Sequence, residues 1–425
     1  MEKKKVRGGF MMDKTTVCII GLGYVGLPLA EAFSKHLKVI GFDTDKVKLS
    51  KLSEGTSNGD LFFTDDPREI GRADFIIICV PTPVTRSKDP DLSYIKSAAE
   101  TAGQNMKRGS TVILESTVYP GVTEDIVSPI LERESGFKCG QDFGIAYCPE
   151  RINPGDTEHT IDNTTKIVSG KDEETTEVVA KLYGKLTPHI FKARDIKTAE
   201  AAKVIENIQR DLNIALMNEF ALVFEKMGLN TSDVLDAAVT KWNFIRYSPG
   251  LVGGHCIPVD PYYLVYKSRE LGYHPQVILA GRAINDGMPD YVTELAIKGL
   301  INTGKVVKGA RVLIMGLAYK QDVADTRESP AGKIINRLME YGVEVVGYDP
   351  LLDDIEGEFG IKAVSSLESL QGIDCVIITV AHFAFRNIKA DTLKGITGDK
   401  PVLIDVRGFL NRQEALEKGF YYRTL

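Results

Sequence analysis

Residues 16–43 contain the pattern that most constrains the fold. An apolar run leads directly into Gly21-Leu-Gly-Tyr-Val-Gly26, and the next apolar run ends at Asp43. Glycines so placed allow a tight turn, close approach of backbone to a pyrophosphate and tight helix packing, while the acid accepts hydrogen bonds from ribose hydroxyls. The pattern predicts a dinucleotide site. The carboxylate of Asp43 would repel a 2′-phosphate and favours NAD, although Lys46 and Lys48 nearby leave NADP open.

Two series of apolar, strand-length runs alternate with helix-length stretches. The first comprises residues 16–20, 38–42, 75–80, 111–115 and 143–147, and the second 311–315, 344–348, 375–380 and 402–405. Such alternation predicts open parallel sheets with helices on both faces. The two series echo each other like a diverged duplication. The second has Ala318 and Lys320 where a glycine-rich turn would continue, so we expect it to hold a different ligand.

Residues 197–227 contain good helix formers and neither proline nor glycine, which predicts one long helix. Its apolar positions suggest a broad buried face, typical of a connecting or dimer helix and equally of an ordinary core helix: Val204, Ile205, Ile208, Leu212, Ala215, Leu216 and Phe220. We therefore predict an α/β protein in which two Rossmann-like, doubly wound sheets are joined by a long central helix and a helical dimerisation region. The expected domains are 13–198, 199–305 and 306–425.

Composition excludes several classes of protein. With 425 residues, 43% hydrophobic and 26% charged, the chain reads as globular and multidomain. A net charge of -6 without a basic stripe argues against nucleic acid as a partner. No apolar run is long enough to span a membrane, and residues 1–12 lack the apolar core of a signal peptide, so we expect a cytoplasmic protein.

Six cysteines without a CxxC pair argue against disulfides or a metal site. Cys18, Cys79 and Cys375 lie in strand-like runs, where a cysteine is usually a small buried hydrophobe. Cys256 differs, because residues 249–261 read Pro-Gly-Leu-Val-Gly-Gly-His-Cys-Ile-Pro-Val-Asp-Pro. That density of glycine and proline predicts a shaped loop whose amides can surround a thiol. NAD and a nucleophilic thiol together permit oxidation of an alcohol to an acid through a thioester.

Seven segments, in order along most of the chain, carry a resemblance to one family. They are Gly21-Leu-Gly-Tyr-Val-Gly-Leu-Pro, Glu115-Ser-Thr-Val-Tyr-Pro-Gly, Cys148-Pro-Glu-Arg-Ile-Asn-Pro-Gly, the helix from Ala199-Glu200 to Glu219, the 249–261 loop, Ala280-Gly-Arg-Ala-Ile-Asn-Asp and Asp325-Thr-Arg-Glu-Ser-Pro. Together they resemble the nucleotide-sugar 6-dehydrogenases that act on UDP-glucose or GDP-mannose. Trp242-Asn-Phe and Asp260-Pro-Tyr-Tyr-Leu are similar to the UDP-N-acetylhexosamine branch.

The resemblance implies a four-electron oxidation at C6 of the sugar with two NAD per turnover, for surface polysaccharide biosynthesis. It implies that Cys256 is the nucleophile, passing through a thiohemiacetal and a thioester. Lys203 and Asn207 would polarise the substrate oxygen and stabilise oxyanions. With Arg210 they fall at i, i+4 and i+7 on one helix face, which is otherwise typical of a solvated surface.

Three further residues match positions near the thiol. Glu150 is the expected handler of protons during thioester hydrolysis, a task that needs an elevated pKa or a water relay. Thr117 matches a threonine that helps to hold water, and Asp260 matches an acid close to the thiol, although a structural turn residue is equally expected there.

Binding residues follow from the turn and from the resemblance. Expected cofactor contacts are Gly21, Gly23, Tyr24, Val25, Gly26, Asp43, Lys48, Thr82, Thr117 and Arg327. Expected substrate contacts are Arg151, Ile152, Lys203, Asn207, Arg210, Gly253, His255, Arg282, Tyr319 and Lys320. Loop polarity is the alternative for Thr82 and Thr117, loop structure for His255, and an ion pair with Asp325 for Arg327. The resemblance also places Arg282 in a partner subunit's site, which implies a homodimer.

We expect UDP-N-acetylglucosamine as substrate before UDP-N-acetylgalactosamine. Pro258 departs from that branch and is common in mannosamine-type enzymes, so UDP-N-acetylmannosamine and UDP-glucose stay open. An enzyme of this fold that stops after one oxidation has no use for the cysteine loop. A non-catalytic nucleotide sensor would bind NAD or a UDP-sugar without turnover.

Overall fold

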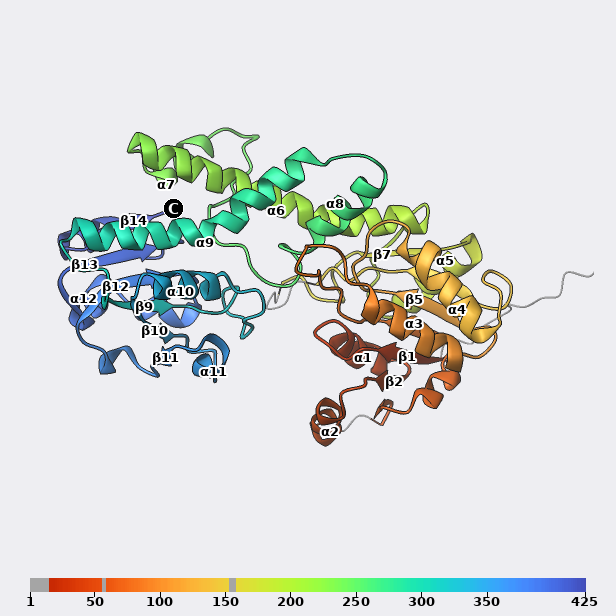
Figure 1. Ribbon diagram of the computed structural model, residues 1–425. Helices are drawn as coiled ribbons and strands as arrows, with labels where there is room; N and C mark the ends of the chain where they lie inside the picture. Colours follow the sequence, from red (N-terminus) through yellow and green to blue (C-terminus); the bar gives the residue numbers. More distant parts are fainter. Residues whose placement is uncertain (1–14, 56–58, 153–157) are drawn as a thin grey trace, which may run out of the picture. The chain divides into compact units, whose positions relative to one another are not determined.

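The computed structural model describes residues 15–55, 59–152 and 158–425, which form two compact units (Figure 1). The first unit comprises the chain up to Glu206 together with Tyr262–His274, and the second Asn207–Pro261 and Pro275–Leu425. The segment searched for a signal peptide, residues 1–12, lies outside the described residues, as do Asn153, Pro154 and Gly155 of the motif that begins at Cys148.

The first unit is built on an eight-stranded sheet with the order β3-β2-β1-β4-β5-β6-β7-β8, parallel except between β6 and β7. Its strands are β1 (Thr16–Ile20), β2 (Lys38–Phe42), β3 (Leu61–Thr64), β4 (Phe75–Ile78), β5 (Thr111–Leu114), β6 (Gly144–Tyr147), β7 (Lys166–Gly170) and β8 (Ile190–Lys192). The helices that belong to it include α1 (Gly26–Ser34), α2 (Lys46–Gly55), α3 (Ser93–Asn105), α4 (Ser128–Ser135) and α5 (Glu173–Tyr183). The order 3-2-1-4-5-6 is that of dinucleotide-binding sheets.

The register of this sheet brings the ends of its strands to one edge. Ile20 pairs with both Phe42 and Ile78, and Leu114 pairs with both Ile78 and Tyr147. The strands are parallel, so the residues that follow these pairs emerge at the same carboxyl edge. That edge, where ligands of doubly wound sheets bind, therefore receives the glycine turn, Asp43 and the segments after β4, β5 and β6.

The second unit contains a fully parallel six-stranded sheet with the same winding, β11-β10-β9-β12-β13-β14. Its strands are β9 (Arg311–Met315), β10 (Glu344–Tyr348), β11 (Lys362–Ala363), β12 (Ile373–Ile378), β13 (Thr397–Asp405) and β14 (Tyr421–Thr424). The smaller helices of this unit are α7 (Thr231–Ala238), α11 (Ile355–Phe359), α12 (Ala390–Ile396) and α13 (Arg412–Glu417). The prediction of two doubly wound sheets is confirmed.

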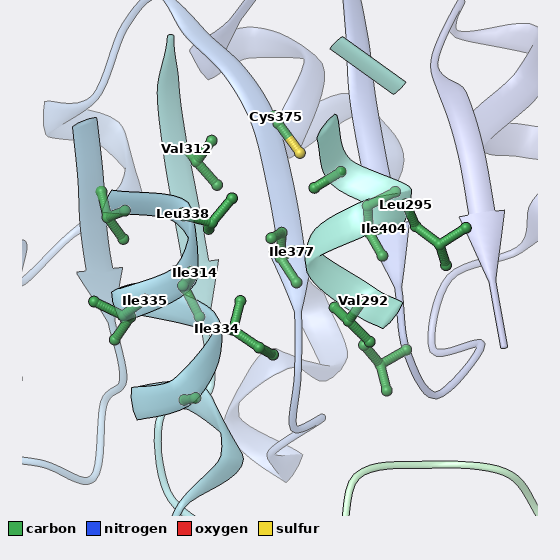
Figure 2. Packing of buried hydrophobic residues seen from close by; sticks show 14 of the residues in the cluster. Val292, Leu295, Val312, Ile314, Ile334, Ile335, Leu338, Cys375, Ile377 and Ile404 are labelled. Carbon is green, nitrogen blue, oxygen red and sulfur yellow. The ribbon is translucent and has the colours of Figure 1, made fainter. Parts of the chain in front are cut away.

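Two helices pack on one face of the second sheet, α9 (Gln276–Asn302) and α10 (Pro330–Glu340) (Figure 2). Val292 of α9 and Ile334 of α10 are fully buried against strand residues such as Ile314 and Ile377. Burying each side chain of this size contributes roughly 1.5–3 kcal/mol. Helix α10 begins at a proline after Ser329, whose hydroxyl accepts from the Ala331 amide, so its start is fixed by local sequence.

The long helix predicted at 197–227 is α6 (Ile196–Met227), and the boundary between the two units falls inside it. Val204, Ile208 and Ala215 are buried, whereas Ile205 is 55% and Leu216 44% exposed in the single chain. Only one stripe of the expected apolar face is therefore used within the chain. Among the described residues, no helix combines the length and apolar character that crossing a membrane demands.

Candidate active site

The glycine turn after β1 has the form that a dinucleotide requires. Gly21 has φ +94°, and a Cβ there would lie 2.7 Å from the Cys79 carbonyl oxygen; a Cβ at Gly26 would lie 1.8 Å from that of Gly21. These two glycines are required by the protein's own packing. A Cβ at Gly23 would meet no atom within 4 Å, so nothing inside the chain demands glycine there. The predicted close approach of a pyrophosphate would demand it.

Asp43 follows β2 and faces this turn. Its Oδ2 accepts from the Leu22 amide at 2.9 Å and from Lys48 Nζ at 2.8 Å, and its Oδ1 accepts from the Asp45 amide. Burial acts to raise the pKa of Asp43, but the hydrogen bonds from Lys48 and the two amides outweigh it, so the pKa is lowered. Asp43 is thus ionised at neutral pH. The Lys48 side chain is 38% exposed and has solvent into which it can withdraw from a ribose.

The remaining predicted cofactor contacts of the first unit surround the same edge. Tyr24 is 45% exposed and Val25 half-buried, both in the turn. Thr82 follows β4 and Thr117 follows β5, and both are half-buried. The loops they occupy are tied together, because the Ser116 hydroxyl donates to the Val80 carbonyl oxygen at 2.7 Å.

Glu150 lies after β6 in a cluster of charged groups. Its Oε1 accepts from the Arg151 and Ile152 amides, both at 2.7 Å, and its Oε2 lies 3.3 Å from Lys166 Nζ. Burial acts to raise the pKa of Glu150, but the charge of Lys166 and the two amides outweigh it and lower the pKa. The elevated pKa considered for Glu150 is therefore not found, which leaves the water relay.

A second carboxyl group in this cluster has the raised pKa. Lys166 Nζ also lies 2.7 Å from Glu115, which accepts a short hydrogen bond from the Tyr183 hydroxyl. Burial raises the pKa of Glu115 to about 7 even though Lys166 opposes it. Burial would lower the pKa of Lys166, but the two carboxylates reverse this and raise it. One ammonium group thus compensates two acids, the buried Glu115 and the half-buried Glu150.

Arg151, a predicted substrate contact, is held within the first unit. Its Nη1 donates to the Thr165 carbonyl oxygen at 2.8 Å and its Nη2 lies 2.9 Å from Glu206. The half-buried Ile152 and Arg151 line a small pocket with Glu150 and Lys166. To donate to a diphosphate, Arg151 would have to use the part of its guanidinium that these partners leave.

On α6 the three predicted substrate residues differ in exposure. Lys203 is half-buried, Asn207 buried and Arg210 exposed. Within the second unit, Asn207 Nδ2 donates to Asp260 Oδ2 at 2.5 Å, and Asp260 is 2% exposed at the start of α8 (Asp260–Glu270). Asn207 therefore does not lie on a solvated face of the helix.

Two residues of α6 hold the cysteine loop of the second unit. Asn207 binds Asp260 at its end, and Asn218 binds Gly250 near its start. Asn218 Oδ1 accepts from the Gly250 amide at 2.8 Å, and its Nδ2 donates to the Gly250 carbonyl oxygen at 3.0 Å. At the other end, the Val259 and Asp260 amides donate to the Cys256 carbonyl oxygen and form the turn that precedes α8. Cys256 itself is half-buried.

The cysteines of the strands behave differently. Cys18, Cys79 and Cys375 are buried, and burial raises the pKa of each thiol. They are packing residues, as predicted. Among the described residues, no group of histidine, cysteine or acidic side chains could hold a metal ion.

The middle of the cysteine loop packs on Tyr319, the predicted substrate contact that follows β9. The His255 ring meets the Tyr319 ring edge to face at 6.1 Å between centroids. Gly253 and Gly254 lie so close to Tyr319 that a Cβ on either would be 3.1 Å or less from its atoms. Burial, followed by the nearby Asp325 and Cys256, raises the pKa of Tyr319. This ring contact fits the loop-structure alternative for His255, and its role as a substrate contact stays a prediction.

Two predicted arginines are engaged in ion pairs of the second unit. Arg327 Nε lies 2.9 Å and 3.0 Å from the two oxygens of Asp325, which is the ion pair considered above. Arg282 is 2% exposed, and its guanidinium bonds to Asp211 and Asp286, each at 2.5 Å. To reach a partner subunit, Arg282 would have to leave both carboxylates, so its intersubunit role stays a prediction. Lys320, beside Tyr319, is half-buried.

Sequence models of three domains of the UDP-glucose/GDP-mannose dehydrogenase family match the chain. The NAD binding domain matches residues 15–59 and 54–187, the central domain 197–287 and the UDP binding domain 313–412. The chain belongs to this family. It is an NAD-dependent UDP-sugar dehydrogenase, and NAD is its cofactor.

Individual relatives agree along almost the whole chain. UDP-N-acetyl-D-glucosamine 6-dehydrogenases of Salmonella typhi and Pseudomonas aeruginosa are 44% and 43% identical, covering 96% and 95% of this chain and 99% of each relative. The solved UDP-D-ManNAc dehydrogenase of Pyrococcus horikoshii is 31% identical, has a TM-score of 0.88 and covers 96% of this chain and 99% of that chain.

In this dehydrogenase, sequence reasoning missed the residues around Glu150. Lys166 is the first residue of β7, a strand not predicted, and Glu115 was noted only as the end of an apolar run and the start of a motif, without a role of its own. A lysine at the start of a short, largely apolar run of strand length, Lys166–Gly170, was the available signal. A lysine is almost never fully buried unless it is paired.

Gly254 offers a test of the packing between the loop and Tyr319. At φ +84° any side chain is strained, and a Cβ would lie 2.6 Å from Tyr319 Cε2. We expect Gly254→Ala to lower kcat by on the order of tenfold or more, because displacing a reacting group by about 1 Å has effects of that size. Gly287→Ala in α9 meets no atom within 4 Å and should leave kcat unchanged. Equal kcat values for both variants would contradict the packing described here.

Glu200 predicts a pH dependence of stability. Its buried carboxyl group accepts from the Gly121 and Thr123 amides and the Thr123 hydroxyl, yet burial raises its pKa to about 7. Between its ordinary value of 4.5 and about 7, the folded chain holds a proton that the unfolded chain has released. The free energy of unfolding therefore falls as pH rises through this window, by up to about 1.4 kcal/mol per pH unit for this group. We expect Glu200→Gln to flatten the slope of the melting temperature against pH between 5 and 7; an unchanged slope would contradict the assignment.

Proposed function

We propose that this dehydrogenase oxidises the C6 alcohol of UDP-N-acetylglucosamine, and UDP-N-acetylgalactosamine second, to the uronic acid for surface polysaccharide assembly. The observation that carries the proposal is Cys256, a half-buried thiol in a loop held by α6, in a chain of the UDP-sugar dehydrogenase family. An enzyme that stops at one oxidation has no need of such a thiol.

The sugar is proposed from the relatives. Those named UDP-N-acetyl-D-glucosamine 6-dehydrogenase are 43–44% identical, whereas the solved UDP-D-ManNAc dehydrogenase is 31% identical. Pro258 keeps UDP-N-acetylmannosamine as the alternative substrate, with UDP-glucose after it.

NAD, when bound, accepts a hydride in each of the two oxidations. Gly23 would leave room for its pyrophosphate, and Asp43 would present a carboxylate to its ribose. In the proposed sequence, the first oxidation converts the alcohol to the aldehyde. The sulfur of Cys256 then bonds to the aldehyde carbon as a thiohemiacetal, and the second oxidation leaves a thioester. Water adds to the thioester carbon, the C–S bond breaks, and the acid and the free thiol result.

Lys203 and Asn207 are proposed to donate to the substrate oxygen as negative charge develops on it. They lie four residues apart on α6 and share one face. The bond from Asn207 to Asp260 fixes the orientation of its amide. Asp260 is therefore proposed as a positioning residue that aims Asn207.

Glu150 is proposed to accept a proton from the attacking water, which Thr117 helps to hold. Lys166 and two amides keep Glu150 ionised, so it begins the hydrolysis step as a base. The Ile152 amide donates to one oxygen of the Glu150 carboxylate. This hydrogen bond fixes the orientation of the carboxylate.

The nucleotide half of the substrate is proposed to bind Arg151, Ile152, Tyr319 and Lys320, while Arg210 and Gly253 are proposed as further substrate contacts. Arginine and lysine suit a diphosphate, because both donate charged hydrogen bonds to its oxygens. We further propose a cytoplasmic homodimer, supported by the exposed apolar side chains Ile205 and Leu216 on α6.

A substrate panel tests the choice of sugar. Purified protein is given NAD with UDP-GlcNAc, UDP-GalNAc, UDP-ManNAc or UDP-glucose, and kcat/KM is measured from NADH formation. We expect the highest value for UDP-GlcNAc and the next for UDP-GalNAc. A higher value for UDP-ManNAc or UDP-glucose would overturn the substrate assignment, and ligand binding without NADH from any of the four would identify a sensor.

A further inference from the structure

The two sheets of this chain carry the same acid at the same position but give it different partners. In the first sheet, Asp43 accepts from the Leu22 amide of the turn and from Lys48, whose side chain is 38% exposed. In the second, Asp349 follows β10 and accepts from the Leu317 and Ala318 amides at 2.7 and 3.0 Å. Its further partner is His382, at 3.0 Å, and both side chains are fully buried.

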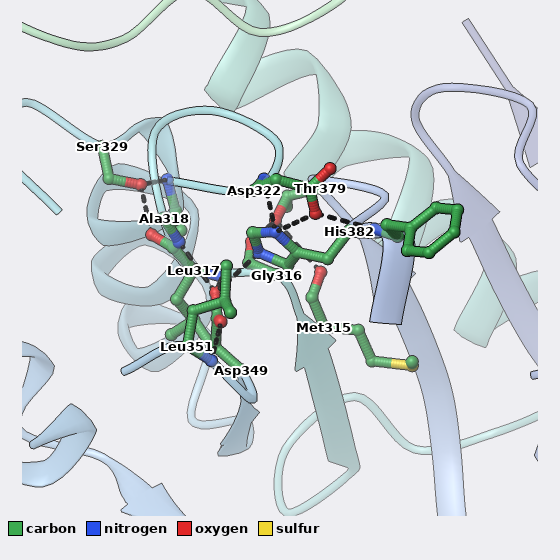
Figure 3. Close-up of polar contacts among 12 residues, drawn as sticks. Met315, Gly316, Leu317, Ala318, Asp322, Ser329, Asp349, Leu351, Thr379 and His382 are labelled. Atoms are coloured by element: carbon green, nitrogen blue, oxygen red, sulfur yellow. Dashed lines mark hydrogen bonds and ion pairs between the residues drawn. The ribbon is translucent and has the colours of Figure 1, made fainter. Parts of the chain in front are cut away.

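His382 joins this acid to the loop after β9 (Figure 3). Its Nδ1 accepts from the Asp322 amide at 2.9 Å, so the hydrogen bond of its Nε2 to Asp349 is a donation from Nε2–H. Burial acts to raise the pKa of Asp349, but the hydrogen bonds from His382 and from the Leu351 and Ala318 amides lower it. A neutral imidazole thus links an ionised carboxylate to a backbone amide, an arrangement we name the His382 bridge, comprising Asp349, His382 and Asp322.

The His382 bridge fixes the loop that carries the proposed nucleotide contacts. Asp322 has φ +59°, and its side chain accepts from the Phe383 amide at 2.8 Å. The segment from Gly316 to Asp322 is therefore held at its start by Asp349 and at its end by His382 and the Phe383 amide. Tyr319 and Lys320 lie between these attachments, and Tyr319 in turn supports the cysteine loop at Gly254.

We infer that His382 is a positioning residue for the UDP half of the substrate, acting through the bridge on Tyr319 and Lys320. The inference rests on the proposed nucleotide contacts of this loop and adds a residue that sequence analysis did not single out. It also distinguishes Asp349, which is paired with a buried histidine, from Asp43 of the first sheet. The partner of Asp349 is enclosed and cannot withdraw into solvent as Lys48 can.

Three variants separate the two hydrogen bonds of the imidazole. His382→Ala removes both. His382→Asn is short enough to retain an oxygen near the Nδ1 position that accepts from the Asp322 amide. His382→Gln extends to the Nε2 position and retains donation to Asp349. His274→Ala, at an exposed histidine, is the matched control.

The probe is UDP, whose binding does not depend on which sugar the enzyme uses, measured by calorimetry beside NAD. We expect His382→Ala to weaken UDP binding on the order of tenfold, the effect of losing one ordinary hydrogen bond that holds the loop, with NAD binding unchanged. His382→Asn should retain more UDP affinity than His382→Gln. Hydrogen exchange at the Asp322 amide should be faster in His382→Gln than in His382→Asn, because the glutamine variant loses the acceptor for that amide.

Unchanged UDP affinity in His382→Ala would overturn the inference, as would equal loss of UDP and NAD binding, which would indicate general unfolding. If the unaltered chain bound NAD but not UDP, the proposed function would fail. Hydrogen exchange at Asp322 would then still decide whether the His382 bridge holds the loop.

Discussion

Replacing Cys256 by alanine is expected to reduce uronic acid formation on the order of 10³-fold or more, since removing a nucleophile costs at least that much where it forms the covalent intermediate. Cys256 is half-buried in a loop held by Asn218, so the smaller side chain should disturb the fold little. NADH formation and acid formation are measured together.

Cys139→Ala is the matched control, because Cys139 is also half-buried but lies in the first unit, before β6. It should retain full acid formation. Full acid formation by Cys256→Ala would show that the acid forms without a thioester on this residue, and would remove the basis of the proposed function.

Replacing Lys166 by methionine should strongly destabilise the first unit. Its ammonium group is the shared partner of Glu115 and Glu150, at 2.7 and 3.3 Å. Breaking a buried ion pair from one side leaves an uncompensated charge and costs roughly 3–5 kcal/mol. Calorimetric unfolding should therefore show a lower melting temperature for this unit. Hydrolysis of the thioester should also be slower, because Glu150 would lose the positive charge that keeps it ionised.

Lys192→Met provides the comparison in the same unit. Lys192 pairs with Glu177 on the surface, with side chains 45% and 46% exposed, and such pairs contribute about 0–1 kcal/mol. Adding Glu115→Gln to Lys166→Met should recover part of the lost stability by removing one of the two acids. Equal melting temperatures for the two lysine variants would contradict the cluster as described.

Local patterns were sufficient to predict most of the fold. Strands β1, β2, β9 and β10 were predicted with their observed bounds, because their apolar runs end sharply at glycine or aspartate. Strands β3, β7, β8, β11 and β14 were not predicted. β7 begins at a lysine whose burial depends on Glu115, far away in the sequence, and β8 is a short, largely exposed strand.

The sequence was sufficient to name candidate site residues, but not to predict the contacts and pKa shifts that surround them. The sequence pointed to Glu150, but its lowered pKa depends on Lys166 and on two local amides. Likewise, the ion pairs of Arg282 with Asp211 and Asp286 could not be read from its motif. His382 gave no signal, because its role arises only when the ends of β10 and β12 are brought together with the loop after β9.

The ratio of NADH to uronic acid, measured with UDP-GlcNAc and excess NAD, tests the central claim most directly. A thiol that carries the aldehyde to a thioester commits each substrate molecule to both oxidations, so two NADH should appear for every acid formed. One NADH per substrate consumed, with an aldehyde as the product, would contradict the account.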